Sequence, residues 1–166
     1  MERAGSNMAR NVYLSWDSYF MLVAMASAQR SKDPSTKVGA CLVSKDHKIL
    51  SVGYNGMPRG CDDGEMPWGR DGAWLETKYP YVCHAEENAI YNNAGASLEG
   101  ATCYVTLFPC NECAKAIIQC GIKEIVYAED KYADTEGVIA SKFMLEKAGV
   151  TCRQYETTGH TVSFNL

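Results

Sequence analysis

The fold is decided by residues 101–128, ATCYVTLFPCNECAKAIIQCGIKEIVYA. Residues 101–108 are an apolar run typical of a strand, and residues 110–120 follow a helical pattern. Residues 124–128 are a second short apolar run. Two strands joined by a helix predict a parallel crossover, which is the repeating unit of an α/β sheet.

The same alternation extends in both directions. We expect a helix over 84–94, another over 135–148 and a last strand over 150–155. Residues 37–44 and 49–54 are β-leaning runs joined by a polar turn, which predicts an antiparallel hairpin. A hairpin combined with parallel crossovers implies a mixed sheet covered on both faces. The fold class predicted is therefore α/β, a three-layer α/β/α sandwich with a mixed five-stranded sheet.

Two further segments complete this pattern. Residues 16–30 are rich in helix formers, and the helix should end before Pro34. Residues 55–82 are rich in Gly, Pro and Asp, and loops of this length inside a domain are usually functional or mobile. The helical face predicted for residues 16–30 consists of Trp16, Tyr19, Phe20, Val23 and Ala26 or Ser27.

Length and composition indicate one domain over residues 1–166, with about 1–12 as a flexible N-terminal extension. The chain has 16 Lys and Arg against 20 Asp and Glu, without the basic stripe of proteins that grip long nucleic acids. We expect neither a membrane span nor a secretory signal. The eight cysteines are then expected to be reduced thiols in a cytoplasmic protein, some of them ligating metal; a disulfide framework is the alternative.

Two motifs indicate the chemistry. His84-Ala85-Glu86 opens one predicted helix, and Pro109-Cys110-Asn111-Glu112-Cys113 opens another directly after a strand. One His and two Cys are ligands that suit tetrahedral zinc, and a helix N-terminus favours the thiolate form of cysteine. Three protein ligands leave a fourth position for water, which is the catalytic pattern. His-x-Glu followed by Pro-Cys-x-x-Cys is the signature of zinc deaminases, with Glu86 as the proton carrier.

Other interpretations of these residues stay open. Cys110 and Cys113 also have the spacing of a redox pair, and Cys83 is a candidate fourth ligand of a structural zinc. Cys120 lies two turns beyond Cys113, too far to share the ion. The cysteines in predicted strands are expected to be small core residues: Cys41, Cys103 and Cys152. A second metal site would draw on Cys61, His47 or His160.

The chain resembles the deoxycytidylate deaminases, of the cytidine deaminase-like fold, along nearly its whole length. The zinc motif alone marks the superfamily, whereas the longer matching runs point to this family. These runs are residues 27–34 (SAQRSKDP), 38–41 (VGAC), 53–58 (GYNGMP), 78–86 (KYPYVCHAE), 107–115 (LFPCNECAK) and 130–132 (DKY).

The resemblance implies that His84, Cys110 and Cys113 bind zinc and that Glu86 shuttles protons. It implies that Asn55 holds the sugar, a simple turn residue before a glycine being the alternative, and we include Ala85 among the substrate contacts. The 5′-phosphate is expected at two loops that supply Lys32, Ser35, Lys37, Lys131 and Tyr132.

The resemblance also implies a homohexamer, activated by deoxycytidine triphosphate and inhibited by thymidine triphosphate, with Mg²⁺ on the effector. We expect the effector to bind at the loop of residues 56–63; the alternative is that this loop is only a solvated acidic turn. Its candidate residues are Gly56, Arg59, Gly60, Asp62 and Asp63. The tail after Tyr155 departs most from the family pattern.

The expected reaction is the zinc-dependent hydrolysis of deoxycytidylate to deoxyuridylate and ammonia, which supplies deoxyuridylate for thymidylate synthesis. The rival hypotheses are a deaminase of another free base, nucleoside or triphosphate, and a catalytically inactive zinc module. A polynucleotide deaminase, with Trp68 and Trp74 as stacking residues, is disfavoured by the net charge of −4.

Overall fold

The computed structural model describes residue 9 and residues 11–166, so most of the predicted N-terminal extension lies outside the described residues. The chain order of the elements is α1 (Trp16–Ala28), β1 (Gly39–Val43), β2 (Ile49–Tyr54), a short 3₁₀ turn (Trp74–Glu76), α2 (Ala85–Tyr91), β3 (Thr102–Leu107), α3 (Asn111–Gln119), β4 (Glu124–Glu129), α4 (Glu136–Lys147) and β5 (Thr151–Gln154). Each predicted strand and helix is present, with ends within a few residues of those expected.

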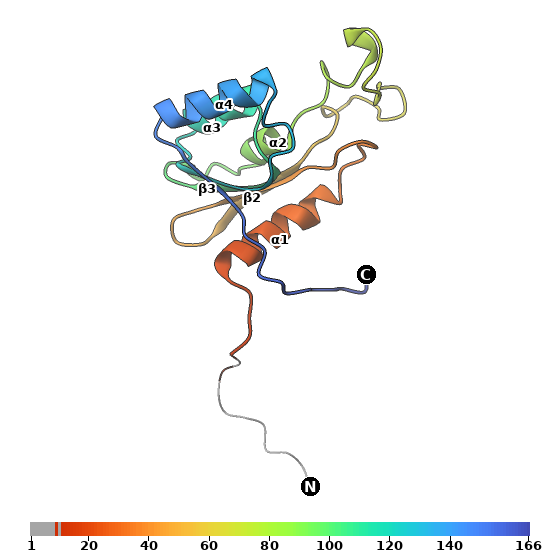
Figure 1. Cartoon of the computed structure of the whole chain (residues 1–166). Helices are drawn as coiled ribbons and strands as arrows, with labels where there is room; N and C mark the ends of the chain where they lie inside the picture. The colour runs from red at the N-terminus through yellow and green to blue at the C-terminus, as the bar shows by residue number, and fades with distance from the viewer. Residues whose placement is uncertain (1–8, 10) are drawn as a thin grey trace.

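The five strands form one mixed sheet in the order β2-β1-β3-β4-β5. β1 pairs antiparallel with both β2 and β3, whereas β3, β4 and β5 run parallel. Helices α2, α3 and α4 cover one face, and α1 lies on the other (Figure 1). The predicted α/β/α sandwich is therefore confirmed. None of the described helices is long and apolar enough to cross a membrane.

Two apolar cores, one on each face, hold the layers together. All five residues of the central strand β1 are buried, and their side chains alternate between the faces. Leu42 packs into the core under α2, α3 and α4, together with Ile117 and Ile125. Cys41 and Val43 point the other way, into the core under α1, which also contains Phe20. The middle of the sheet is thus packed on both faces, and a functional site can form only at the ends of the strands.

The face predicted for α1 is wrong in part. Phe20 is buried as expected, but Trp16 and Tyr19 are 55% and 42% exposed. The helix instead turns Met21, Ala24 and Ala28 toward the sheet. It approaches β1 so closely that a Cβ on Gly39 would lie 1.9 Å from the carbonyl oxygen of Ala24. Only small side chains fit at this contact, so Ala24 and Ala28 face the sheet and the larger Trp16 and Tyr19 side chains lie outside it.

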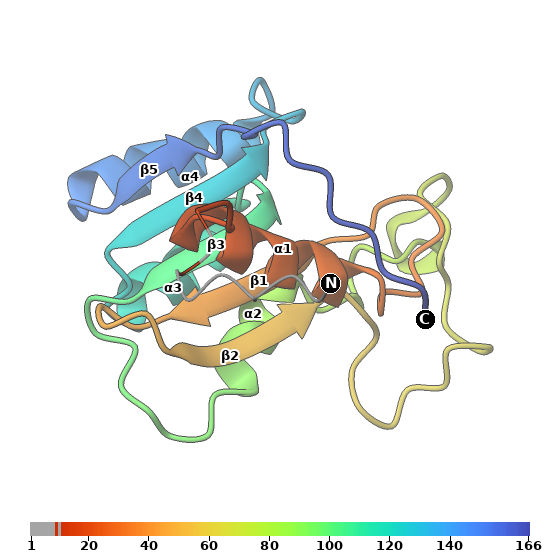
Figure 2. The same cartoon turned by 90° about the horizontal axis from the view of Figure 1, so that it is seen from below.

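The displaced Trp16 finds a partner in the turn between β1 and β2. Its ring stacks on the imidazole of His47, with the two centroids 4.5 Å apart. His47 has a φ of 61°, a left-handed conformation that is uncommon outside glycine. His47 lies in the polar turn predicted between residues 37–44 and 49–54. Figure 2 shows α1 lying across β1 and β3, with the segment after β5 passing beside it.

One expectation about the cysteines is also wrong. Cys41 and Cys103 are buried in the core, but Cys152 is exposed. Its strand, β5, is at the edge of the sheet and so has a neighbouring strand on one side only. All eight cysteines are free thiols, so no disulfide framework forms.

Candidate active site

Two helix starts bring the predicted metal ligands together. His84 is the N-cap residue of α2, and Cys110 is the N-cap residue of α3, so Cys113 lies in the first turn of α3. The His84 Nδ1 atom lies 3.4 Å from the Cys110 sulfur and 3.3 Å from the Cys113 sulfur. The three ligand atoms all lie within 4.8 Å of one another.

This cluster fits a zinc ion. Nitrogen and sulfur ligands at zinc bonding distance lie about 3.5 Å apart in a tetrahedral site, close to the separations found here. Hydrogen bonding from Cys113 and then from His84 lowers the pKa of Cys110 to about 3, so this thiol is a thiolate at neutral pH. Within the part of the chain that the structure describes, no other group of three His, Cys, Asp or Glu side chains is placed to hold a metal. Cys83, the candidate fourth ligand, is outside the group.

Glu86 lies next to the cluster, in the first turn of α2. The residue is 4% exposed and lines the same cavity as His84 and Cys110. Burial raises the pKa of Glu86 to about 7, against the lowering effect of His84. A carboxyl group with a pKa near neutrality can both accept and donate a proton at working pH, which is what an acid–base catalyst requires.

A cavity of about 390 Å³ opens onto these residues. Its volume is in the usual range for a site that binds a small molecule. Apolar side chains such as Leu107 and Phe108 line it together with the charged side chains of Asp33, Lys78 and Arg70. The cavity therefore offers both apolar side chains and charged groups to a ligand.

Comparison with known proteins identifies the family. Residues 14–129 match the model described as the cytidine and deoxycytidylate deaminase zinc-binding region. The chain is 56% identical over 147 residues to the deoxycytidylate deaminase of Mus musculus, an alignment that covers 88% of this chain and 83% of the relative. The chain belongs to the cytidine and deoxycytidylate deaminase family. The predicted family and the prediction of a deaminase are thus confirmed.

Other members of the family agree with this assignment. The deoxycytidylate deaminase of Homo sapiens is 54% identical over the same share of this chain and 83% of its own. The dCMP deaminase of cyanophage S-TIM5, solved in complex with dCMP and dUMP, has a TM-score of 0.65 and 30% identity. That comparison covers 82% of this chain and 94% of the phage chain. The cluster of His84, Cys110 and Cys113 lies inside the zinc-binding region of the family.

The deaminase places three of the predicted substrate residues in the cavity wall. Asn55, Ala85 and Tyr132 all line it. Asn55 is buried at the end of β2, where its side-chain oxygen accepts a hydrogen bond from the backbone N–H of Val38 at 2.8 Å. An amide held this firmly presents the same atoms to every ligand.

The other predicted phosphate residues lie outside the residues that line this cavity. The Lys32 side chain is exposed and pairs with Asp63. The Lys131 ammonium lies 5.2 Å from the centre of the Tyr132 ring, at the cavity edge that Tyr132 forms. Ser35 and Lys37 belong to the loop after α1, which contributes Asp33 and Thr36 to the wall. Phosphate binding by these four residues stays a prediction.

The candidate residues of the loop predicted for allosteric control are not among those that line the cavity. Gly56 forms an isolated antiparallel bridge with Cys83, which fixes the start of the loop against the entry to α2. Arg59 and Gly60 are exposed, and Asp62 accepts a hydrogen bond from the Gly64 N–H at 2.7 Å. Asp63 is the partner of Lys32 and so connects this loop to the loop after α1.

Three charged residues of the site were not predicted: Asp33, Lys78 and Arg70. Asp33 and Lys78 form a buried ion pair, and Arg70 Nε donates to the Tyr79 hydroxyl at 3.0 Å. Burial acts to raise the pKa of Asp33, but the hydrogen bond from Lys78 and those from two backbone amides bring it below its ordinary value. The stretches 27–34 and 78–86 contain two of these residues, but a lysine or aspartate in a loop gives no sign of burial.

Proposed function

We propose that this deaminase converts deoxycytidylate to deoxyuridylate by hydrolysis, releasing ammonia. The observation that supports this most directly is the position of Glu86, buried in the cavity wall beside His84 and Cys110. An ionised carboxyl group that is buried among apolar side chains without a partner costs free energy, because it loses its hydration. Next to a zinc site it is a proton carrier, which the deamination of cytosine requires.

The residues of the site divide the chemistry among them. His84, Cys110 and Cys113 would hold the zinc ion, which supplies a Lewis acid that makes water nucleophilic near neutral pH. Glu86 accepts a proton as water attacks C4 of the base and delivers it to N3. It then takes the remaining proton from the new hydroxyl group on C4 and transfers it to the amino group, so that the bond between C4 and this nitrogen breaks, ammonia leaves and the C4 oxygen becomes the carbonyl oxygen of uracil. Water supplies all the atoms that are gained, and no oxidant or reductant is needed.

The polar residues of the cavity wall are the proposed binding site for the sugar and phosphate of the nucleotide. We assign the sugar to Asn55 and further ligand contacts to Ala85 and Tyr132, and the position of all three in the cavity wall supports this assignment. We assign the 5′-phosphate to the loops with Lys32, Ser35, Lys37, Lys131 and Tyr132. The phage relative solved with dCMP and dUMP supports a monophosphate as the substrate.

The regulatory part of the proposal rests on the family resemblance. We propose a homohexamer in the cytoplasm, activated by deoxycytidine triphosphate with Mg²⁺ and inhibited by thymidine triphosphate, supplying deoxyuridylate for thymidylate synthesis. The loop with Gly56, Arg59, Gly60, Asp62 and Asp63 is the proposed control site. Its contact with Lys32 is the observation that links it to the substrate loop.

Ammonia release by the zinc-loaded protein tests the substrate. The panel is deoxycytidylate, deoxycytidine triphosphate, deoxycytidine and a short cytosine-containing single strand, each with and without trace triphosphate plus Mg²⁺. We expect rapid turnover of the monophosphate, increased by the triphosphate. Turnover of another member of the panel in preference to it would replace the proposed substrate. No turnover at all, with zinc bound stoichiometrically, would leave a structural metal domain.

A further inference from the structure

A buried ion pair forms part of the cavity wall. The Lys78 Nζ atom lies 2.5 Å from Asp33 Oδ2, and the two side chains are only 8% and 1% exposed. The partners are 45 residues apart, so the pair joins the loop after α1 to the long loop before α2. Both residues line the cavity. Charges this deeply buried are stable only when they are paired and hydrogen-bonded, so each group depends on the other.

Asp33 also shapes the loop that follows it. Its second oxygen, Oδ1, accepts hydrogen bonds from the backbone N–H groups of Ser35 at 2.8 Å and Thr36 at 3.0 Å. An aspartate that accepts from the amides two and three residues further on closes a tight turn. The turn brings the carbonyl group of Thr36 toward Asn55.

Asn55 is fixed by this arrangement. Its side-chain nitrogen donates to the Thr36 carbonyl oxygen at 3.0 Å and to Asp33 Oδ2 at 3.3 Å. Its side-chain oxygen accepts from the Val38 N–H at 2.8 Å. A flipped amide would place its oxygen against two acceptors, so only one orientation is compatible with these partners. Both N–H groups are in use, and the atom that remains available to a ligand is the oxygen, with one lone pair.

We infer that Asp33 is a positioning residue, which together with Lys78 holds Asn55 so that its oxygen accepts a hydrogen bond from a sugar hydroxyl of the nucleotide. The inference rests on the proposed function and extends it to sugar recognition. Asn55 then selects ligands that can donate at this point, as a 3′-hydroxyl group can. We place the effect of Asp33 on the ligand at Asn55, while its Oδ1 atom supports the turn at Ser35 and Thr36.

A double-mutant cycle on deoxycytidylate turnover tests this. Because Asp33→Asn leaves the Lys78 charge buried and unpaired, the variant is Asp33→Leu with Lys78→Met, which replaces the buried ion pair by apolar groups and also removes the acceptor of the Ser35 and Thr36 amides. We expect it to raise KM about tenfold, the effect of one lost hydrogen bond, with kcat nearly unchanged. Asn55→Ala should raise KM similarly, and combining all three substitutions should add nothing further.

A matched control and an independent measurement complete the design. Asp46→Asn breaks the exposed pair of Asp46 with Lys48, 2.6 Å apart, and should leave KM unchanged. The side-chain amide resonance of Asn55 in ¹⁵N NMR, assigned by its absence in Asn55→Ala, should move in the Leu/Met variant and stay in the control. This measurement needs no activity.

The outcomes separate the two proposals. A wild-type protein that turns over none of the cytosine nucleotides would overturn the proposed function and the inference with it. An active wild-type protein whose KM effects multiply, or whose Leu/Met variant keeps the wild-type KM and Asn55 resonance, would overturn the inference alone. A variant with lower thermal stability but unchanged KM would show the ion pair to be structural.

Discussion

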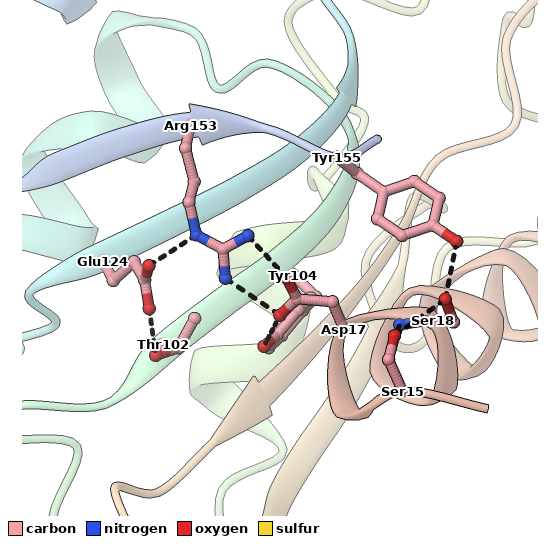
Figure 3. Close-up of polar contacts among 8 residues, drawn as sticks. All are labelled: Ser15, Asp17, Ser18, Thr102, Tyr104, Glu124, Arg153 and Tyr155. Carbon is pink, nitrogen blue, oxygen red and sulfur yellow. Dashed lines mark hydrogen bonds and ion pairs between the residues drawn. The ribbon is translucent and has the colours of Figure 1, made fainter. Parts of the chain in front are cut away.

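Arg153 on β5 grips Asp17 in the first turn of α1 with two parallel hydrogen bonds. The Nη1 and Nη2 atoms donate to the two carboxylate oxygens at 2.6 and 2.8 Å (Figure 3). The same guanidinium donates through Nε to Glu124 on β4 at 2.7 Å. The Tyr104 hydroxyl also donates to Asp17, at 2.7 Å. The Arg153 guanidinium group thus connects the edge strand β5 to α1, which lies near the other end of the sequence.

The first prediction concerns this contact and its dependence on pH. Arg153→Met should lower the free energy of unfolding by about 1 kcal/mol at pH 7, a small value because both side chains are more than a third exposed. The hydrogen bond from Arg153, against desolvation, lowers the pKa of Asp17. A lowered carboxyl pKa contributes stability above its unfolded value near 4, and that contribution is lost as the pH falls through the folded value.

Denaturant unfolding at pH 7 and at about pH 3 checks this. The stability difference between wild type and Arg153→Met should shrink at the lower pH. Lys48→Met, which breaks an exposed pair, is the control and should show little difference at either pH. A difference that grows on acidification would contradict the assigned role of Asp17.

The second prediction concerns the contact between α1 and β1. Gly39→Ala places a Cβ 1.9 Å from the Ala24 carbonyl oxygen and 2.6 Å from the Ala28 nitrogen, both backbone atoms. We expect a loss of about 3 kcal/mol or more, the range of overpacking in a core. Gly69→Ala, whose Cβ would meet nothing within 4 Å, should be close to neutral. Thermal melts compare the two, and equal melting temperatures would show that α1 does not pack as closely as described.

The third prediction concerns the metal. Cys110→Ser and Cys113→Ser should each abolish stoichiometric zinc binding, because each removes one of the three proposed ligands. Cys120→Ser, at the other end of α3, is the control and should retain zinc. Removing zinc from the wild type with a chelator should lower its stability, by about 4 kcal/mol if free zinc had been a thousandfold above Kd. Metal analysis and melting curves measure both, and zinc retained by Cys110→Ser would exclude it as a ligand.

The parts of the structure that could be predicted are those encoded locally. The hairpin, the parallel crossovers and the two helix starts each follow from a short pattern, such as the apolar run before Cys110. Helix starts place His84 and Cys110 through backbone geometry alone, and so their meeting could be expected from the order of the elements. The proposed zinc ligands could therefore be identified from the sequence without the structure.

The parts that were missed depend on contacts between distant segments. Which face of α1 is buried depends on the close approach to Gly39, a contact that helical periodicity does not contain. The pair of Asp33 and Lys78 joins loops 45 residues apart, and neither loop has a regular pattern. Cys152 is exposed because its strand is at the edge of the sheet, which depends on strand order rather than on the apolar run.

The most direct test of the central claim is the turnover of deoxycytidylate by Glu86→Gln, with zinc content and melting temperature measured on the same sample. The change removes the proposed proton carrier and keeps the shape of a side chain that is 4% exposed. We predict a fall in kcat of about 10²–10⁴ with zinc still bound and the fold intact. Glu146→Gln, an exposed glutamate on α4, should match the wild type. A Glu86→Gln protein that keeps zinc and a wild-type kcat would contradict the account.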